Sequence, residues 1–178
     1  PAEAKGLLKT AIRDDDPVVF VQHELLYSVK GEVPDEGVEY TVPLNRGEVK
    51  REGRDVTIIT FSRMVHISLQ AAEELAKEGI DAEIIDLRTL RPLDTRTVLN
   101  SVMKTNRIVT VEQGWPVCSI GSEICAVVAS EAFDYLDAPP TKVTGKDVPM
   151  PYAANLEKLA LPTVDDVIAA VKAVCYKD

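Results

Sequence analysis

The sequence predicts an α/β protein with a doubly wound, mostly parallel sheet. Short apolar runs typical of buried strands recur along the chain, and an amphipathic helix pattern follows most of them. Residues that cap helices stand where these patterns begin or end. The 178 residues are 46% hydrophobic, which is enough for one substantial core. Alternating strands and helices of this size favour a parallel sheet with helices on both faces.

The amino-terminal part is less regular. Residues 2–13 predict a helix because apolar side chains recur on one face, and the acidic run 14–16 ends it. The apolar run 18–21 predicts a buried strand. Glycine, proline and charged residues interrupt any period across 30–54, so we expect a linker there with at most one short strand.

The regular pattern begins after the linker. Asp94 and Thr163 are expected to cap two of its helices, the second with Asp166 in a capping box. The strands are expected at 55–61, 82–87, 107–111 and 140–144, and the helices at 66–78, from Asp94, at 121–132 and from Thr163.

Residues 145–162 are too irregular for a helix or strand pattern. Three prolines restrict their own backbone and that of the preceding residues. We expect a rigid surface excursion after a strand, and such a path is typical of a segment that contacts a neighbouring molecule.

Charge and composition narrow the function classes. The net charge of −9 argues against nucleic acid, which requires a basic face. The apolar runs are far shorter than the ~20 residues that cross a membrane. The three cysteines form no C-x-x-C pair, which argues against a disulfide framework or a cysteine zinc site and favours a reducing compartment. Because the chain opens on Pro1 directly before a helix pattern, we expect further sequence upstream.

Ligands of open parallel sheets bind beyond the carboxyl ends of the strands. The loops 62–64, 88–92 and 112–116 are therefore the candidate ligand-binding loops. None of them carries a G-x-G-x-x-G or P-loop spacing. Trp115 is interpreted as a packing anchor or interface aromatic rather than a cofactor stack. Arg88 and Arg91 are either held for a ligand carboxylate or paired within the fold with Asp86 or Asp94.

The acidic turn 14–16 also has two interpretations. It is either a solvated turn or part of a site for a hard cation, because it follows a helix end whose carbonyl oxygens carry partial negative charge.

Taken together, the sequence resembles a known family, the beta subunits of the pyruvate dehydrogenase component. These belong to the transketolase-like enzymes that depend on thiamine diphosphate. The resemblance covers nearly the whole chain. It is carried by residues 1–8, 11–14, 17–20, 24–27, 86–92, 104–106 and 111–112, and most strongly by 145–162. It implies that residues 1–29 end a pyrimidine-binding domain, 30–54 are a linker, and 55–178 form a transketolase carboxy-terminal domain.

The resemblance implies a function as part of an enzyme that oxidatively decarboxylates pyruvate and transfers the acetyl group to lipoyl groups. Residues 147–152 resemble the pyruvate branch rather than the branched-chain branch. The family's cofactor-activating glutamate lies before the position of Pro1, so no catalytic or cofactor-binding residue is assigned. Thiamine diphosphate and its magnesium ion would be bound by parts outside this chain together with an alpha subunit, and the fragment alone would be inactive. The expected contribution of this chain is scaffold, subunit contacts and docking.

Two sites carry over by resemblance. A potassium site matches Ala11, Ile12 and Asp14, with Asp16 where relatives usually have Asn. Docking of the dihydrolipoyl acetyltransferase core points to Asp137 and the terminal Asp178, and an acidic patch suits a basic binding domain.

The other expected partners are the alpha subunit and a second beta subunit. The expected location is the cytoplasm of a bacterium, which we favour, or the mitochondrial matrix of a eukaryote. Two alternatives stay open: a stand-alone dimerisation or docking module without catalysis, and a different flavodoxin-like enzyme with a phosphate compound at the 114–121 loop.

Overall fold

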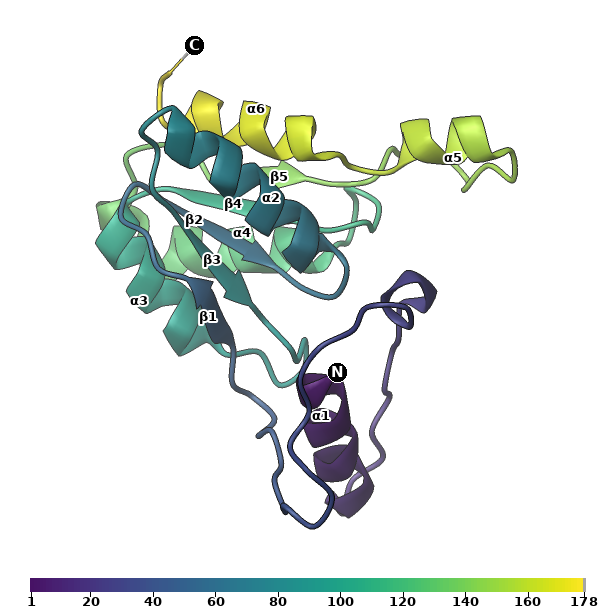
Figure 1. Cartoon of the computed structure of the whole chain (residues 1–178). Coiled ribbons are helices and arrows are strands. Elements are labelled where there is room, and N and C mark those ends of the chain that lie inside the picture. The colour runs from purple at the N-terminus through teal and green to yellow at the C-terminus, as the bar shows by residue number, and fades with distance from the viewer. Residues whose placement is uncertain (178) are drawn as a thin grey trace.

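A computed structural model describes residues 1–177 of the chain. Five strands form one sheet in the order β1-β3-β2-β4-β5, and every neighbouring pair is parallel except β1 with β3 (Figure 1). This confirms the predicted fold class. The strands are β1 (Glu48–Arg51), β2 (Val56–Thr60), β3 (Ala82–Asp86), β4 (Ile108–Val111) and β5 (Thr141–Val143).

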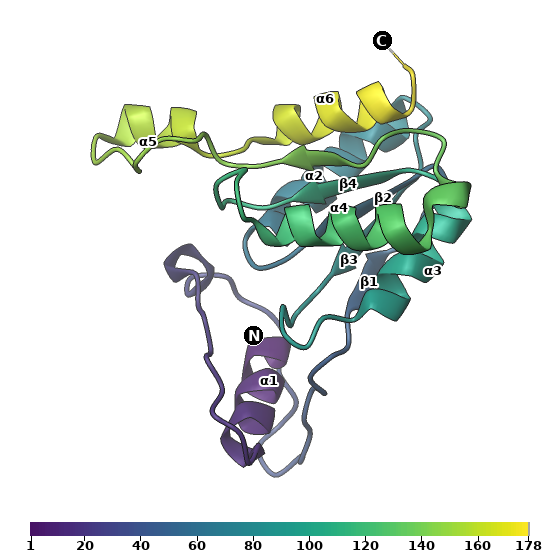
Figure 2. The same ribbon diagram turned by 180° about the vertical axis from the view of Figure 1, so that it is seen from behind.

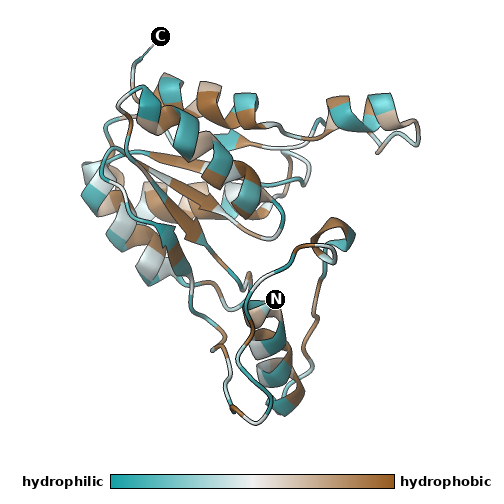
Figure 3. Cartoon of the chain, viewed as in Figure 1, coloured by the Kyte–Doolittle hydropathy of each residue, from teal (hydrophilic) through white to brown (hydrophobic). Residues whose placement is uncertain are grey.

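Helices cover both faces of the sheet. Helices α2 (Met64–Lys77) and α6 (Val164–Val174) lie on one face, and α3 (Thr95–Thr105) and α4 (Ile120–Glu131) lie on the other (Figures 1 and 2). Every residue of β2, β3 and β4 is buried, as central strands between two helix layers require. Figure 3 shows the same division, with apolar strands inside and polar residues on the outward helix faces.

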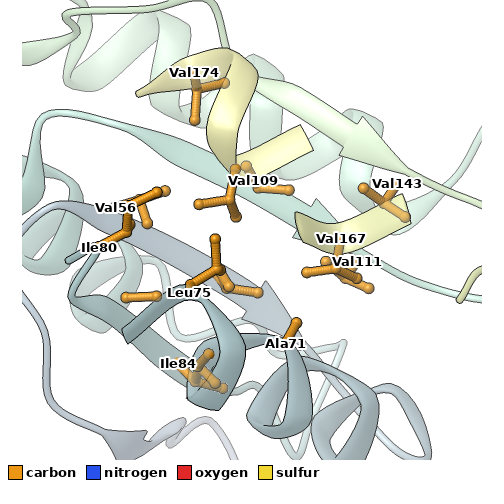
Figure 4. Packing of buried hydrophobic residues seen from close by; sticks show 14 of the residues in the cluster. Val56, Ala71, Leu75, Ile80, Ile84, Val109, Val111, Val143, Val167 and Val174 are labelled. Atoms are coloured by element: carbon orange, nitrogen blue, oxygen red, sulfur yellow. The ribbon is translucent and has the colours of Figure 1, made fainter. Parts of the chain in front are cut away.

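Two hydrophobic clusters fill the space between the layers. The larger one lies between the sheet and helices α2 and α6, with Leu75, Val167 and Val171 completely buried (Figure 4). The second lies under α3 and α4 and includes Ile85 and Ile124. The buried members of both clusters all belong to residues 56–174, so this part of the chain holds the core.

The predicted caps of α3 and α6 are confirmed. The Asp94 carboxylate accepts a hydrogen bond from the Thr97 backbone N–H at 3.1 Å. Thr163 and Asp166 form a reciprocal capping box, in which hydrogen bonds from Thr163 hold the pKa of Asp166 below its usual value. Both helix starts are therefore set by local sequence.

The amino-terminal segment lies apart from the core (Figure 1). The predicted helix is confirmed as α1 (Ala2–Arg13), and one 3-10 turn, η1 (Glu24–Leu26), follows. The predicted buried strand at 18–21 is wrong: these residues form no strand, and Val19 and Val21 are 88% and 86% exposed. A strand is stabilised by a neighbour that pairs with its backbone and covers its side chains, and residues 1–177 place none beside this segment.

The segment 145–162 projects from the sheet domain as an arm (Figures 1 and 2). Contrary to the expectation from sequence, it contains a short helix, α5 (Ala154–Ala160). No side chain caps its start, so the sequence lacks the usual signal for a helix there. Tyr152 and Leu159 on the arm are strongly exposed, and this leaves apolar surface without a partner among residues 1–177.

Candidate functional site

A cluster of four charged residues joins α1 to the sheet domain. Lys50 of β1 lies 2.5 Å from the Glu3 carboxylate, and the Arg88 Nε donates to the same carboxylate at 3.0 Å. Arg88 also lies 2.5 Å from the carboxylate of Glu48. Arg88 is thus paired within the fold, but its partners are Glu3 and Glu48. Asp86, one of the two expected partners, accepts only its backbone N–H.

We expect this cluster to make stability depend on acid pH. Burial alone would raise the pKa of Glu3, but hydrogen bonds within the cluster, including those from Lys50 and Arg88, lower it from 4.5 to about 2. A lowered folded-state pKa stabilises the fold fully above the unfolded value, and this contribution is lost as pH falls from 4.5 towards 2. Melting temperatures of wild type and Glu3→Gln should differ at pH 7 and converge as the pH falls from 4.5 to about 2. Parallel pH profiles for the two proteins would refute this role of Glu3.

The residues of the expected cation site meet at the carboxyl end of α1. Asp14 is the C-terminal cap, and its Oδ1 accepts the Asp16 backbone N–H at 2.9 Å. Ile12, Asp14 and Asp16 are exposed, and Ala11 is half-buried. Within residues 1–177 no group of three or more His, Cys, Asp or Glu side chains could hold a metal ion. That observation concerns side chains, whereas the expected potassium site uses backbone carbonyl oxygens as well. Potassium binding therefore stays a prediction.

Asp137, the expected docking residue, lies on the surface before β5. Its Oδ2 accepts a hydrogen bond from Arg107 at 3.1 Å, and its backbone carbonyl accepts one from the Tyr176 hydroxyl at 3.0 Å. Its side chain is 54% exposed, so a partner could still reach it. The other expected docking residue, Asp178, lies outside the described residues.

The loop after β4 contacts the arm. The Trp115 indole is 57% exposed and donates a hydrogen bond to the Val148 carbonyl at 3.0 Å. Behind it, the buried Glu112 carboxylate accepts the Gly121 backbone N–H at 2.7 Å at the start of α4. Trp115 therefore contacts the arm and keeps more than half of its surface exposed.

A cavity lies beside the strand-end loop 88–92. It has a volume of about 390 Å³ and opens between the linker and the start of α3. The sequence does not reveal this site, because its two walls are about fifty residues apart in the chain and no motif marks either wall. It is lined by Pro43, Leu44, Asn45, Arg46, Leu93, Asp94, Thr95 and Arg96.

Comparison with known proteins identifies relatives of this chain. The family model described as "Transketolase, C-terminal domain" matches residues 45–167. The mitochondrial pyruvate dehydrogenase E1 component subunit beta-1 of Arabidopsis thaliana is 54% identical over 177 residues, which is 98% of this chain and 49% of that protein. The pyruvate dehydrogenase E1 component subunit beta of Rhizobium meliloti is 55% identical over 176 residues, which is 99% of this chain and 38% of that protein.

A solved structure shares the fold. The split-gene transketolase described as an inactive beta4 tetramer has a TM-score of 0.68 and 30% sequence identity, and the match covers 82% of this chain and 46% of that one. The chain spans half or less of the length of these curated relatives. By the family match and these identities, the chain belongs to the transketolase C-terminal domain family and is a homologue of pyruvate dehydrogenase E1 beta subunits.

Proposed function

We propose that this chain works as part of the beta subunit of a thiamine-diphosphate-dependent pyruvate dehydrogenase. The intact enzyme would oxidatively decarboxylate pyruvate and transfer the acetyl group to lipoyl groups. The observation that carries this proposal is 54% identity over 98% of the chain to a protein named as such a subunit. Fold likeness alone would not suffice, because one fold hosts many functions.

Residues 1–177 do not fit thiamine diphosphate with its magnesium ion. The described part of the chain offers no cluster of acidic, histidine or cysteine side chains for a metal ion. The 114–121 loop lacks the glycine spacing that cradles a diphosphate. We therefore assign the cofactor to parts outside this chain, acting with the alpha subunit, and assign no catalytic step to the residues described here.

The exposed apolar side chains support a role in subunit contacts. Large apolar surfaces on a folded protein typically mark interaction sites. Here they concentrate in two places, the amino-terminal segment and the arm with its neighbouring loop. They include Ile12, Val19, Val21, Leu25 and Tyr27 in the first, and Trp115, Val117, Met150, Tyr152 and Leu159 in the second. The proposed occupants are the remainder of the beta subunit, the alpha subunit and a second beta subunit.

For docking of the dihydrolipoyl acetyltransferase core we propose the exposed side of Asp137 together with the terminal Asp178. The net charge of −9 suits a basic binding domain. As for location, we propose the bacterial cytoplasm or the mitochondrial matrix, since the relatives include a bacterial protein and proteins named as mitochondrial. Among residues 1–177 no helix has the length and apolar character to cross a membrane.

The proposed potassium site at the end of α1 predicts an ion-specific stabilisation. A ligand that binds only the folded state raises its stability, and ~1 kcal/mol corresponds to ~2–4 °C in a chain of this size. Melting temperature should therefore be higher in potassium chloride than in sodium chloride at equal ionic strength. Asp14→Ala should abolish the difference, whereas Asp15→Ala, which removes the same charge beside it, should keep it. Equal melting temperatures of the wild type in both salts would remove the site.

Calorimetry tests the assignment of the cofactor to other parts of the enzyme. Titrating thiamine diphosphate and magnesium into the 178-residue chain should give no heat of binding at micromolar affinity. Saturable binding at that affinity would contradict the proposal, because a complete cofactor site would then lie within this chain.

A further inference from the structure

The cavity of about 390 Å³ is built by two segments that are held together. One wall is the linker stretch 43–46, and the other is the stretch 93–96 that opens α3. The Gly47 backbone N–H donates to the Asp94 Oδ2 at 3.0 Å, and the Asn45 backbone N–H donates to the Thr89 hydroxyl at 3.1 Å. These bonds fix the linker against the sheet domain, so the cavity is a defined part of the fold.

Two arginines on opposite walls of this cavity are unpaired. Arg46 and Arg96 are both exposed, and neither forms an ion pair with any residue in 1–177. By contrast, Arg88 and Arg107 elsewhere in the domain each contact a carboxylate.

One acidic group also lines the cavity. The carboxylate of Asp94 would repel an anion. Its oxygens already accept hydrogen bonds from the Thr97 backbone N–H, the Thr97 hydroxyl and the Gly47 backbone N–H. Two guanidinium groups against one carboxylate leave a net positive charge, and the amino-terminal end of α3 adds partial positive charge. These charges together favour the binding of an anion with moderate affinity.

We propose that this cavity binds a small organic anion. Guanidinium groups form paired hydrogen bonds with carboxylate and phosphate oxygens alike, so the acidic group would lie between Arg46 and Arg96. Pro43, Leu44 and Leu93 provide an aliphatic surface for the rest of the molecule. No aromatic ring from residues 1–177 lines the cavity, so it offers no stacking surface for a nucleobase. The ligand is therefore a short aliphatic acid or phosphate ester.

The test maps two probes on the labelled 178-residue chain by nuclear magnetic resonance. Inorganic phosphate and citrate are titrated separately, with sodium chloride keeping the ionic strength constant. The backbone amide signals of residues 44–47 and 94–97 should shift and saturate with a dissociation constant on the order of 1 mM. The probe that binds more tightly shows whether the ligand carries phosphate or carboxylate.

Variants show whether the two arginines hold the probe. Arg46→Gln and Arg96→Gln should each weaken binding about tenfold. Arg54→Gln is the matched control, since that side chain is 86% exposed and lies outside the cavity, and it should bind as the wild type does. The proposal would be overturned if neither probe shifted these amide signals. It would also be overturned if all three variants lost the same binding affinity. If the cavity variants fail to fold, the location of the wild-type shifts decides the question.

The same variants distinguish anion binding in this cavity from binding of thiamine diphosphate at a complete cofactor site. Thiamine diphosphate is itself an anion, so weak binding in the cavity would become about tenfold weaker in Arg46→Gln. Micromolar binding that persists in that variant would instead refute the proposed function and leave the anion site intact.

Discussion

Replacing Leu75 by alanine should lower the free energy of unfolding by about 3 kcal/mol. Leu75 is completely buried on the face of α2 that packs against the sheet and α6 (Figure 4). Truncating a buried leucine removes hydrophobic stabilisation and leaves a cavity, which together cost ~2–5 kcal/mol. Central strands and two helices surround this position and limit its collapse. Urea denaturation monitored by circular dichroism measures the change.

A matched control uses a leucine on the surface. Leu159 on the arm is 70% exposed, so Leu159→Ala should change stability by no more than ~0.5 kcal/mol. If the two variants lost the same stability, the cluster between the sheet and α6 would not be the main core.

The second large effect is expected from Lys104. The Glu83 carboxylate on β3 is almost completely buried and forms an ion pair with Lys104 of α3. Glu83 also accepts hydrogen bonds from the Ser101 hydroxyl and, at 3.3 Å, from the Gly53 backbone N–H. Burial alone would lower the pKa of Lys104, but its contacts with Glu83 and Glu52 outweigh burial and raise it. The ion pair thus compensates the negative charge of a carboxylate that is buried inside the fold.

Lys104→Met should therefore cost about 2–4 kcal/mol. Removing one partner of a buried pair leaves an uncompensated charge, which costs ~3–5 kcal/mol when both groups are buried. The Lys104 side chain is 42% exposed, so water replaces part of its effect and the expected cost lies about 1 kcal/mol below that range. Urea denaturation again measures the loss.

Two further variants separate charge compensation from packing. Adding Glu83→Gln to Lys104→Met should recover part of the stability, because no buried charge then remains. Lys77→Met breaks an exposed pair with Glu74 on α2 and should cost less than ~1 kcal/mol. A double variant less stable than Lys104→Met alone would show that the side chain of Glu83, and not its charge, matters.

The sheet domain could be predicted from sequence because its signals are local. The largely apolar runs of β2, β3 and β4 are typical of strands that are buried on both faces. The caps at Asp94 and Thr163 directly mark the residues at which their helices begin. Residues 18–21 differ from the prediction because their apolar side chains suit burial, but nothing within residues 1–177 covers them. Helix α5 in the arm differs for another reason, since no side chain caps its start.

The sites were harder to predict because they depend on distant contacts. Arg88 pairs with Glu3 and Glu48, which are 85 and 40 positions away, and no spacing rule links them. The cavity between Arg46 and Arg96 arises only after the linker is bound to the start of α3. The cation and docking residues came from family resemblance, so their roles stay predictions.

The coding sequence immediately upstream of the Pro1 codon tests the central claim most directly. If this chain is part of a thiamine-dependent beta subunit, the open frame continues upstream and encodes a pyrimidine-binding domain with its cofactor-activating glutamate. That added domain would cover the exposed valines at positions 19 and 21. A start codon or an in-frame stop directly before Pro1 would contradict the account.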